Sequence, residues 1–239
     1  MRTPVLIALM VSTLTAGSYP ARAQEEPGKI VEQYVKAAGG GKALSRIQAL
    51  TLEGTFASDN GKTGTYTLDT KLPNRYYSEL LAGDKNLIEA YNGKSAWHQN
   101  AARELGTLVG PEGMQLEAAA QYYNSRLLNL KKNKITLAFV GHAEVRGRDA
   151  LQLAVTTAAG VKRQAFFDPQ THLIVKEAAT VGGVEEEILY DDYRTVENVK
   201  LPHKIELHRG TTNTTSTSRA WRSMEPWANA CLISQSNRK

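Results

Sequence analysis

Hydrophobic residues along the chain first follow a helical spacing and then alternate with polar ones. Over residues 27–38 they recur every three or four positions, which predicts an amphipathic helix. The glycines at 39–41 predict the end of this helix, because glycine readily adopts the left-handed conformation that closes helices. From Ile47 onward the period becomes two, and turn sequences such as Asn60-Gly61 and Asn92-Gly93 separate the alternating stretches. This part of the chain therefore predicts an antiparallel sheet.

One longer helix interrupts the predicted sheet. Between residues 114 and 130, apolar residues follow one another on one face of a predicted helix of about 17 residues. They are Leu116, Ala120, Tyr123, Leu127 and Leu130. Alternating stretches resume near Ile135 and continue to His208, so we expect about ten or eleven strands joined by short turns. The pattern predicts a closed or partly closed antiparallel barrel, with residues 24–218 as its domain.

The first 23 residues resemble an export signal rather than part of the fold. Arg2 gives a basic start, an apolar run covers residues 5–11, and Ala21-Arg22-Ala23 is a small-x-small cleavage site. The apolar run is too short to span a bilayer, which takes about 20 residues. The residue directly after the cut is Gln24 and not a cysteine, so the acylation site of a bacterial lipoprotein is missing. We expect cleavage after Ala23 and a periplasmic protein that is not a lipoprotein; the alternative is a buried N-terminal helix.

Composition and charge narrow the class of protein. A chain of 239 residues that is 41% hydrophobic and 22% charged fits one globular domain and excludes collagen, a coiled coil and a disulfide-stapled miniprotein. Its net charge of +5 is too small to predict a nucleic-acid partner, which would need clustered basic residues. Cys231 is the single cysteine, so an intrachain disulfide and a cysteine metal site are both excluded. We expect residues 219–239 to form a poorly ordered tail.

No residue pattern in the chain points to catalysis. The segment 39–42 lacks the glycine spacing and the hydroxyl residue of a phosphate-binding loop. The five histidines include no helical pair, and His203 and His208 fall on opposite faces of a strand. We expect the carboxylates of 185–192 on a solvated face, and no nucleophile elbow is present. The sequence therefore predicts no catalytic residue, no metal site and no cofactor.

The predicted sheet has more apolar surface than its helices can cover. A barrel of about ten strands encloses a cavity unless side chains fill it. The inward-facing candidates that would line this cavity are Leu52, Phe56, Tyr66, Leu68, Tyr76, Leu80, Ile88, Trp97, Leu137 and Phe139. The alternative is an ordinary core that these side chains fill completely. The residue pattern alone leaves both open.

Several motifs resemble the LolA superfamily of periplasmic lipoprotein carriers. The run 71–76 (Lys-Leu-Pro-Asn-Arg-Tyr) resembles its basic strand end with Pro-Asn and an aromatic residue. The run 88–97 resembles its next strand, Asn-Gly-Lys turn and tryptophan, and 166–174 resembles a later hairpin. Each motif is ordinary hairpin chemistry, and the order in which they occur, over about residues 47–210, is the distinctive feature.

The resemblance implies an α+β fold, mainly antiparallel β. It would be an unclosed half-barrel with an N-terminal helix and a lid helix over an apolar cavity. The implied function is to carry the acyl chains of lipoproteins or lipids toward the outer membrane. Tyr76 and Trp97 match aromatic residues of the family, and the predicted helix 114–130 takes the position of the lid. The ligand-binding set thereby gains Leu116, Tyr123 and Leu127.

The implied partners are the acylated cargo, an inner-membrane donor and an outer-membrane acceptor, and we expect a monomer. One residue departs from the family, because the arginine that latches the lid, immediately before Pro-Asn, is Leu72 here. The arginine that would form the latch in this family is therefore missing from the chain. Two other functions stay open: a lipid- or envelope-stress-sensing regulator of the same fold, and an interaction scaffold with a filled core and no ligand.

Overall fold

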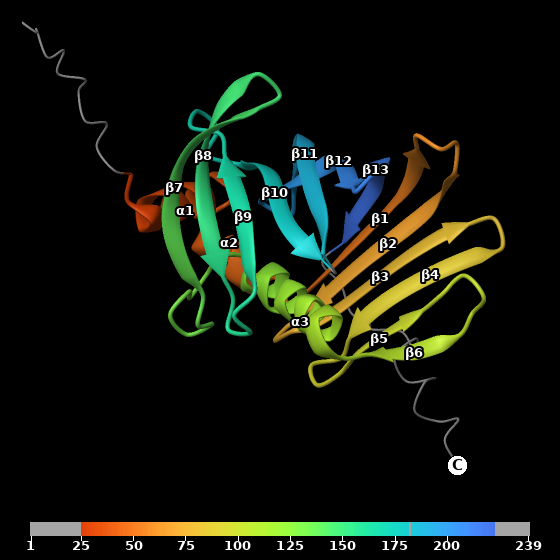
Figure 1. The fold of residues 1–239 in the computed structure, drawn as a ribbon. Helices are drawn as coiled ribbons and strands as arrows, with labels where there is room; N and C mark the ends of the chain where they lie inside the picture. Colours follow the sequence, from red (N-terminus) through yellow and green to blue (C-terminus); the bar gives the residue numbers. More distant parts are fainter. Residues whose placement is uncertain (1–24, 182, 223–239) are drawn as a thin grey trace, which may run out of the picture.

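The computed structural model describes residues 25–181 and 183–222 (Figure 1). The helices in this part of the chain are α1 (Pro27–Ala37), α2 (Gly41–Arg46) and α3 (Gly110–Ser125). The first six strands are β1 (Ala49–Ser58), β2 (Thr63–Lys71), β3 (Arg75–Ala82), β4 (Lys85–Tyr91), β5 (Ala96–Gln99) and β6 (Leu105–Leu108). The later strands are β7 (Thr136–Val145), β8 (Arg148–Thr156), β9 (Lys162–Phe167), β10 (Ile174–Val181), β11 (Val184–Val196), β12 (Val199–Arg209) and β13 (Thr212–Arg222).

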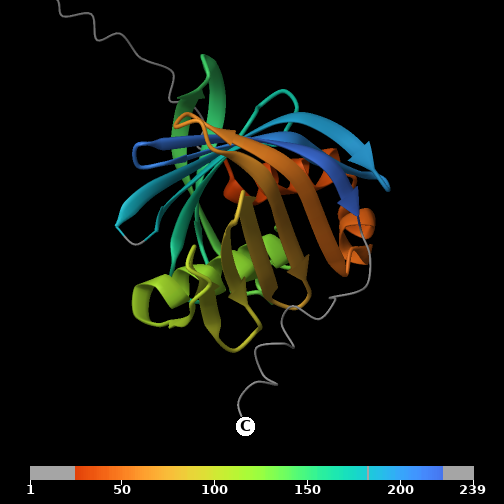
Figure 2. The same ribbon diagram turned by 90° about the vertical axis from the view of Figure 1, so that its right-hand side faces the viewer.

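The strands form one antiparallel sheet of 13 strands in the order β6-β5-β4-β3-β2-β1-β13-β12-β11-β10-β9-β8-β7. From β1 to β6 the chain therefore runs outward to one edge of the sheet, and α3 then crosses to the other edge at β7. From β7 the strands return inward until β13 pairs with β1. The sheet is strongly bent, and α3 lies across its concave side between the two halves (Figures 1 and 2). This architecture confirms the predicted unclosed half-barrel.

Two of the strands were absent from the prediction. β6 has four residues, too few to show a pattern, and β13 is rich in Ser and Thr and has no apolar alternation. Both are strands because a neighbour pairs with their backbone: β5 with β6, and β1 and β12 with β13. β13 extends to Arg222, beyond the predicted boundary at residue 218. The remaining tail and the predicted signal segment lie outside the described residues, so both stay predictions.

The segment that follows α1 shows why glycine is needed at positions 39 and 40. Gly39 and Gly40 have φ values of 127° and 87°, which are left-handed conformations that favour glycine. A Cβ on Gly39 would lie 2.2 Å from the carbonyl oxygen of Asn198, so the backbone that follows α1 is packed directly against the β11–β12 turn. The amide of Lys200 also donates to the carbonyl oxygen of Ala38, at 2.9 Å.

Helix α3 begins and ends earlier than the prediction of 114–130. Pro111 lies in its first turn, a position that favours helix initiation because proline has no N–H to satisfy there. Arg126 and Leu127 have φ values of 48° and 54°, which end the helix after Ser125. Leu127 and Leu130 thus lie in the following loop rather than on a helical face. They still pack into the core, which explains why they are apolar.

The helices cover the two ends of the concave face. At one end, Val31 of α1 and Leu127 pack against Leu153 and Phe167 in the largest core cluster. At the other end, Leu116 of α3 packs against the inner side chains of β4 and β5. Among the described residues, no helix is both long and apolar enough to cross a membrane.

Candidate functional site

The strand register decides which side chains share the concave face with α3. Tyr76 lies opposite Tyr91, and Tyr91 lies opposite Ala96; all three pack in the cluster that contains Leu116 of α3. Residues directly opposite one another in an antiparallel ladder point to the same face. Following the register across the sheet places these apolar residues on the inner face: Leu50, Leu52, Phe56, Tyr66, Leu68, Leu80, Ile188, Tyr190, Ile205 and Leu207.

Most of the predicted ligand-binding residues lie on this face or pack against it. Those on the central strands are Leu52, Phe56, Tyr66, Leu68, Tyr76 and Leu80. Leu116 and Tyr123 belong to α3. Leu137 and Phe139 on β7 and Leu127 in the loop after α3 belong to the core near α1, so they lie away from the central strands.

Two predicted residues, Ile88 and Trp97, lie on the opposite face. Ile88 is opposite Glu79, and Trp97 is opposite Ala90, and none of these shares a face with Tyr76. The prediction was wrong here because β4 carries apolar residues on both faces, so its alternation does not show which face is inward.

The middle of the inner face is apolar and only partly covered. Leu68, Leu80, Ile188, Ile205 and Leu207 are half-buried, and none belongs to a core cluster of the described residues. They lie on β2, β3, β11 and β12, on either side of the β1–β13 seam. We call these five residues the inner apolar stripe. Helix α3 covers β2–β6 on one side of it.

A buried polar network lies beneath α3, at one side of this stripe. Glu177 on β10 is 3% exposed and Arg163 on β9 is 5% exposed. The carboxylate of Glu177 accepts hydrogen bonds from the hydroxyls of Tyr122 at 2.5 Å, Tyr190 at 2.7 Å and Tyr123 at 3.3 Å. Arg163 donates to the Tyr123 hydroxyl at 3.2 Å and lies 3.9 Å from the Glu177 carboxylate. The carboxylate thus holds two adjacent tyrosines of α3.

Aromatic rings complete this network. The Arg163 guanidinium carbon lies 5.2 Å from the ring centre of Tyr122 and 5.3 Å from that of Tyr123, within cation–π range. Tyr76 on β3 stacks on Tyr123 with 6.2 Å between ring centres. Burial, reinforced by the charge of Glu177, raises the pKa of Tyr122 and Tyr190, and burial raises the pKa of Tyr76 to about 12. These phenols therefore keep their protons at neutral pH and remain hydrogen-bond donors.

Two further hydrogen bonds attach α3 to both halves of the sheet. Asn124 donates to the carbonyl oxygen of Arg75 at the start of β3, at 2.8 Å. Gln115 donates to the carbonyl oxygen of Thr180 on β10, also at 2.8 Å. Because α3 is the segment between edges β6 and β7, these bonds and the Glu177 network make it a strap across the open sheet. Leu72 has an apolar side chain and takes no part in these bonds.

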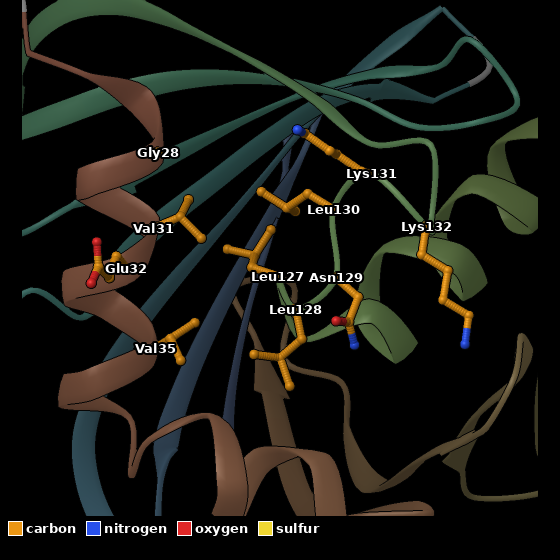
Figure 3. Close-up of a pocket in the computed structure, with 10 residues that line it drawn as sticks. All are labelled: Gly28, Val31, Glu32, Val35, Leu127, Leu128, Asn129, Leu130, Lys131 and Lys132. Carbon is orange, nitrogen blue, oxygen red and sulfur yellow. The ribbon is translucent and has the colours of Figure 1, made fainter.

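A surface groove lies at the other end of the strap (Figure 3). It has a volume of about 530 Å³ and runs between α1 and the loop 127–132. Its walls include Val31 and Val35 from α1 and Leu128 from the loop, and Lys131 and Lys132 lie at its margin. The groove is therefore separate from the inner apolar stripe.

The network residues Arg163, Glu177, Tyr122 and Tyr190 were missed at the sequence level. The signal was available for Arg163, because Arg163, Ala165 and Phe167 alternate on β9 and so share one face. A charged residue in an inward position needs a buried partner, which here is Glu177.

Glu185, Asp191 and Asp192 are exposed, as expected for the carboxylates of 185–192, whereas Glu186 and Glu187 are half-buried. Glu186 lies on the inner face, opposite Ala179 and Arg209. Across the described residues, no three His, Cys, Asp or Glu side chains gather into a group that could hold a metal ion. The predicted absence of a cofactor and of catalysis stays a prediction.

No known sequence family and no curated protein matches the chain, but solved structures do. A LolA superfamily protein from Nitrosomonas europaea aligns with a TM-score of 0.53 at 9% identity, over 84% of this chain and 94% of that chain. A putative outer membrane lipoprotein-sorting protein domain from Vibrio parahaemolyticus aligns with a TM-score of 0.51 at 10% identity, over 81% and 90%. The chain has a LolA-like fold.

A third structure extends this LolA-like group. A DUF1329 family protein from Desulfovibrio piger aligns with a TM-score of 0.51 at 14% identity, over 83% of this chain and 93% of that chain. At such low identity the likeness concerns the fold alone. This chain is therefore a divergent example of the LolA-like fold, in agreement with the resemblance in its hairpin motifs.

Proposed function

We propose that this protein is a periplasmic carrier that binds the acyl chains of lipoproteins or lipids and moves them toward the outer membrane. The observation that carries the proposal is the inner apolar stripe, five half-buried residues on a concave face that the helices leave partly uncovered. Each acyl methylene removed from water contributes about 0.8 kcal/mol. A chain lying along the stripe would therefore gain several kcal/mol of binding free energy without any catalytic group.

Helix α3 would act as the lid of this carrier. Its hydrogen bonds to Glu177, Thr180 and the Arg75 carbonyl favour one position over the concave face. A ligand that enters beneath the helix exchanges some of these contacts for its own, and the difference sets the net affinity. This exchange keeps binding moderate and reversible, as a carrier requires.

The cargo class is supported by one structurally similar protein, a putative outer membrane lipoprotein-sorting protein domain. On this account the carrier is a monomer that receives cargo from an inner-membrane donor and passes it to an outer-membrane acceptor. No nucleic acid, metal or cofactor takes part. A lipid- or stress-sensing regulator would bind ligand on the same face, and a filled scaffold would bind none.

Displacement of a fluorescent acyl probe from the purified protein tests the proposal. Leu68→Glu places a charge on the stripe and should weaken probe binding at least tenfold. Thr65→Glu is the matched control, because Thr65 is exposed on the other face of the same strand. Circular dichroism should show both variants folded. If the wild type fails to bind the probe, or if folded Leu68→Glu binds as well as Thr65→Glu, the proposal is wrong.

A further inference from the structure

Two buried polar groups on the inner face have no hydrogen-bond partner among the residues that the structure describes. They are Nε of Arg163 and the hydroxyl of Tyr66, and both atoms are inaccessible to solvent. Buried donors are almost always paired, because an unmade hydrogen bond costs the full desolvation of the group. Each of these groups therefore has the capacity to bind an acceptor that the described part of the chain does not supply.

A row of aromatic side chains joins the two groups across the inner face. Arg163 donates to the Tyr123 hydroxyl, and the Tyr123 ring stacks on the Tyr76 ring. Tyr76 in turn lies close to Tyr66: burial raises the pKa of the Tyr66 hydroxyl, and the Tyr76 phenol raises it further. Tyr66 also lies directly opposite Leu80 of the inner apolar stripe. The unpaired donors thus border the apolar surface on which an acyl chain would lie.

The charges near the row decide what kind of acceptor fits. Arg163 already has a counter-ion in Glu177, at 3.9 Å, and Glu186 lies on the same face. The cluster therefore carries no surplus positive charge that would favour an anionic head group. A neutral oxygen acceptor satisfies both donors without adding a buried negative charge.

We propose that the inner face selects acyl esters and amides, whose carbonyl oxygens accept hydrogen bonds from the Tyr66 hydroxyl and from Arg163 Nε. The inference rests on the proposed function, since it names the chemical class of the acyl ligand. Arg163 lies beneath α3, so its bond forms once the helix has shifted to admit the ligand. The hydrogen bond from Tyr66 can be tested by itself, because Tyr66→Phe removes only the hydroxyl.

The test compares two lipids that differ only at the carbonyl groups. 1,2-Dipalmitoylglycerol has two ester carbonyls, and 1,2-di-O-hexadecylglycerol has the same chains and glycerol without them. Each is delivered from cyclodextrin to the full-length exported protein and displaces a fluorescent acyl probe. Two additional hydrogen bonds should make the ester bind about tenfold more tightly than the ether.

Variants of the two donor residues then show which of them causes the preference for the ester. Tyr66→Phe should reduce the ester preference to about threefold, and Arg163→Lys, which keeps the charge but lacks Nε, should reduce it similarly. Tyr77→Phe is the matched control, because its hydroxyl bonds Glu79 on the outer face, and it should keep the full preference.

Three results would overturn the inference. Equal binding of ester and ether by the wild type removes the carbonyl selection but leaves the carrier proposal standing. A full ester preference in Tyr66→Phe removes the assignment of a donor to Tyr66. Failure of both lipids to displace the probe, or of the probe to bind at all, contradicts the proposed function itself, so the two failures are distinguishable.

Discussion

The hydroxyl of Tyr122 on α3 donates a 2.5 Å hydrogen bond to the carboxylate of Glu177 on β10, and neither residue is more than 4% exposed. A short hydrogen bond to a buried carboxylate is among the stronger polar contacts in proteins. It ties the helix that crosses the open sheet to one half of that sheet. The strap is therefore held by tyrosines and a glutamate.

Removing this hydroxyl should loosen α3 selectively. Tyr122→Phe leaves the ring in place but takes one donor from the buried carboxylate, at an expected loss of about 1.5–3 kcal/mol in the free energy of unfolding. Hydrogen–deuterium exchange should be faster in α3 than in wild type, while β8 and β9 keep their protection. Tyr77→Phe, whose hydroxyl bonds Glu79 on the outer face, serves as control. Unchanged exchange in α3 would show that the bond does not hold the strap.

Glu186 makes the stability depend on pH in an unusual direction. Burial raises its pKa above the ordinary value of 4.5; Arg163 and Arg209 oppose the shift, whereas Glu89 and Glu177 add to it. The folded state thus holds the proton more tightly than the unfolded state, so this group's contribution to stability falls as pH rises from about 4.5 through the raised pKa.

Replacing this carboxylate should therefore stabilise the protein at neutral pH. Glu186→Gln should unfold at a higher urea concentration than wild type at pH 7, and the gain should shrink as the pH falls toward about 4.5. Glu185→Gln removes an exposed neighbouring carboxylate and should show no such trend. A Glu186→Gln protein that is less stable than wild type at pH 7 would contradict the assigned direction.

Gly39 should tolerate no side chain. Gly39→Ala would bring a Cβ to 2.2 Å from the Asn198 carbonyl oxygen in a left-handed conformation, and we expect a loss of about 2–4 kcal/mol in the free energy of unfolding. Gly28→Ala is the control, because no atom lies within 4 Å of its Cβ position and alanine favours the helix. Urea denaturation measures both, and equal stabilities would refute the close packing of α1 on the β11–β12 turn.

Alternation along the chain predicted an antiparallel barrel, closed or partly closed, because most of its strands are apolar on one face. The resemblance to the LolA superfamily added that the barrel is unclosed. On β2 the inner residues Tyr66 and Leu68 alternate with threonines, and the register confirms their common face. On β4 apolar residues occupy both faces, so the prediction placed Ile88 on the inner face although it lies on the outer one. Trp97 lies opposite Ala90 and was misplaced in the same way. Pattern reasoning thus predicted the antiparallel sheet and several of its inward-facing residues.

Other features depend on contacts that the pattern does not encode. Leu127 and Leu130 continue the spacing of α3, yet positive φ values end the helix before them, and they are apolar because the core near α1 takes them. β13 is a strand because β1 and β12 pair with its backbone, although its sequence lacks alternation. The polar network beneath α3 joins residues from four separate elements, and only the folded chain brings them together.

The central claim is that the inner apolar stripe binds acyl chains, and photo-crosslinking in the native cell envelope tests it most directly. A photoreactive amino acid replaces Leu80 on the stripe in one variant and its neighbour Leu81, 40% exposed on the outer face, in the other. Mass spectrometry then identifies the adducts. The account predicts adducts with lipids or acylated proteins from position 80 and none of them from position 81. Efficient incorporation at position 80 that yields only water or self adducts, or the same lipid adducts from both positions, would contradict it.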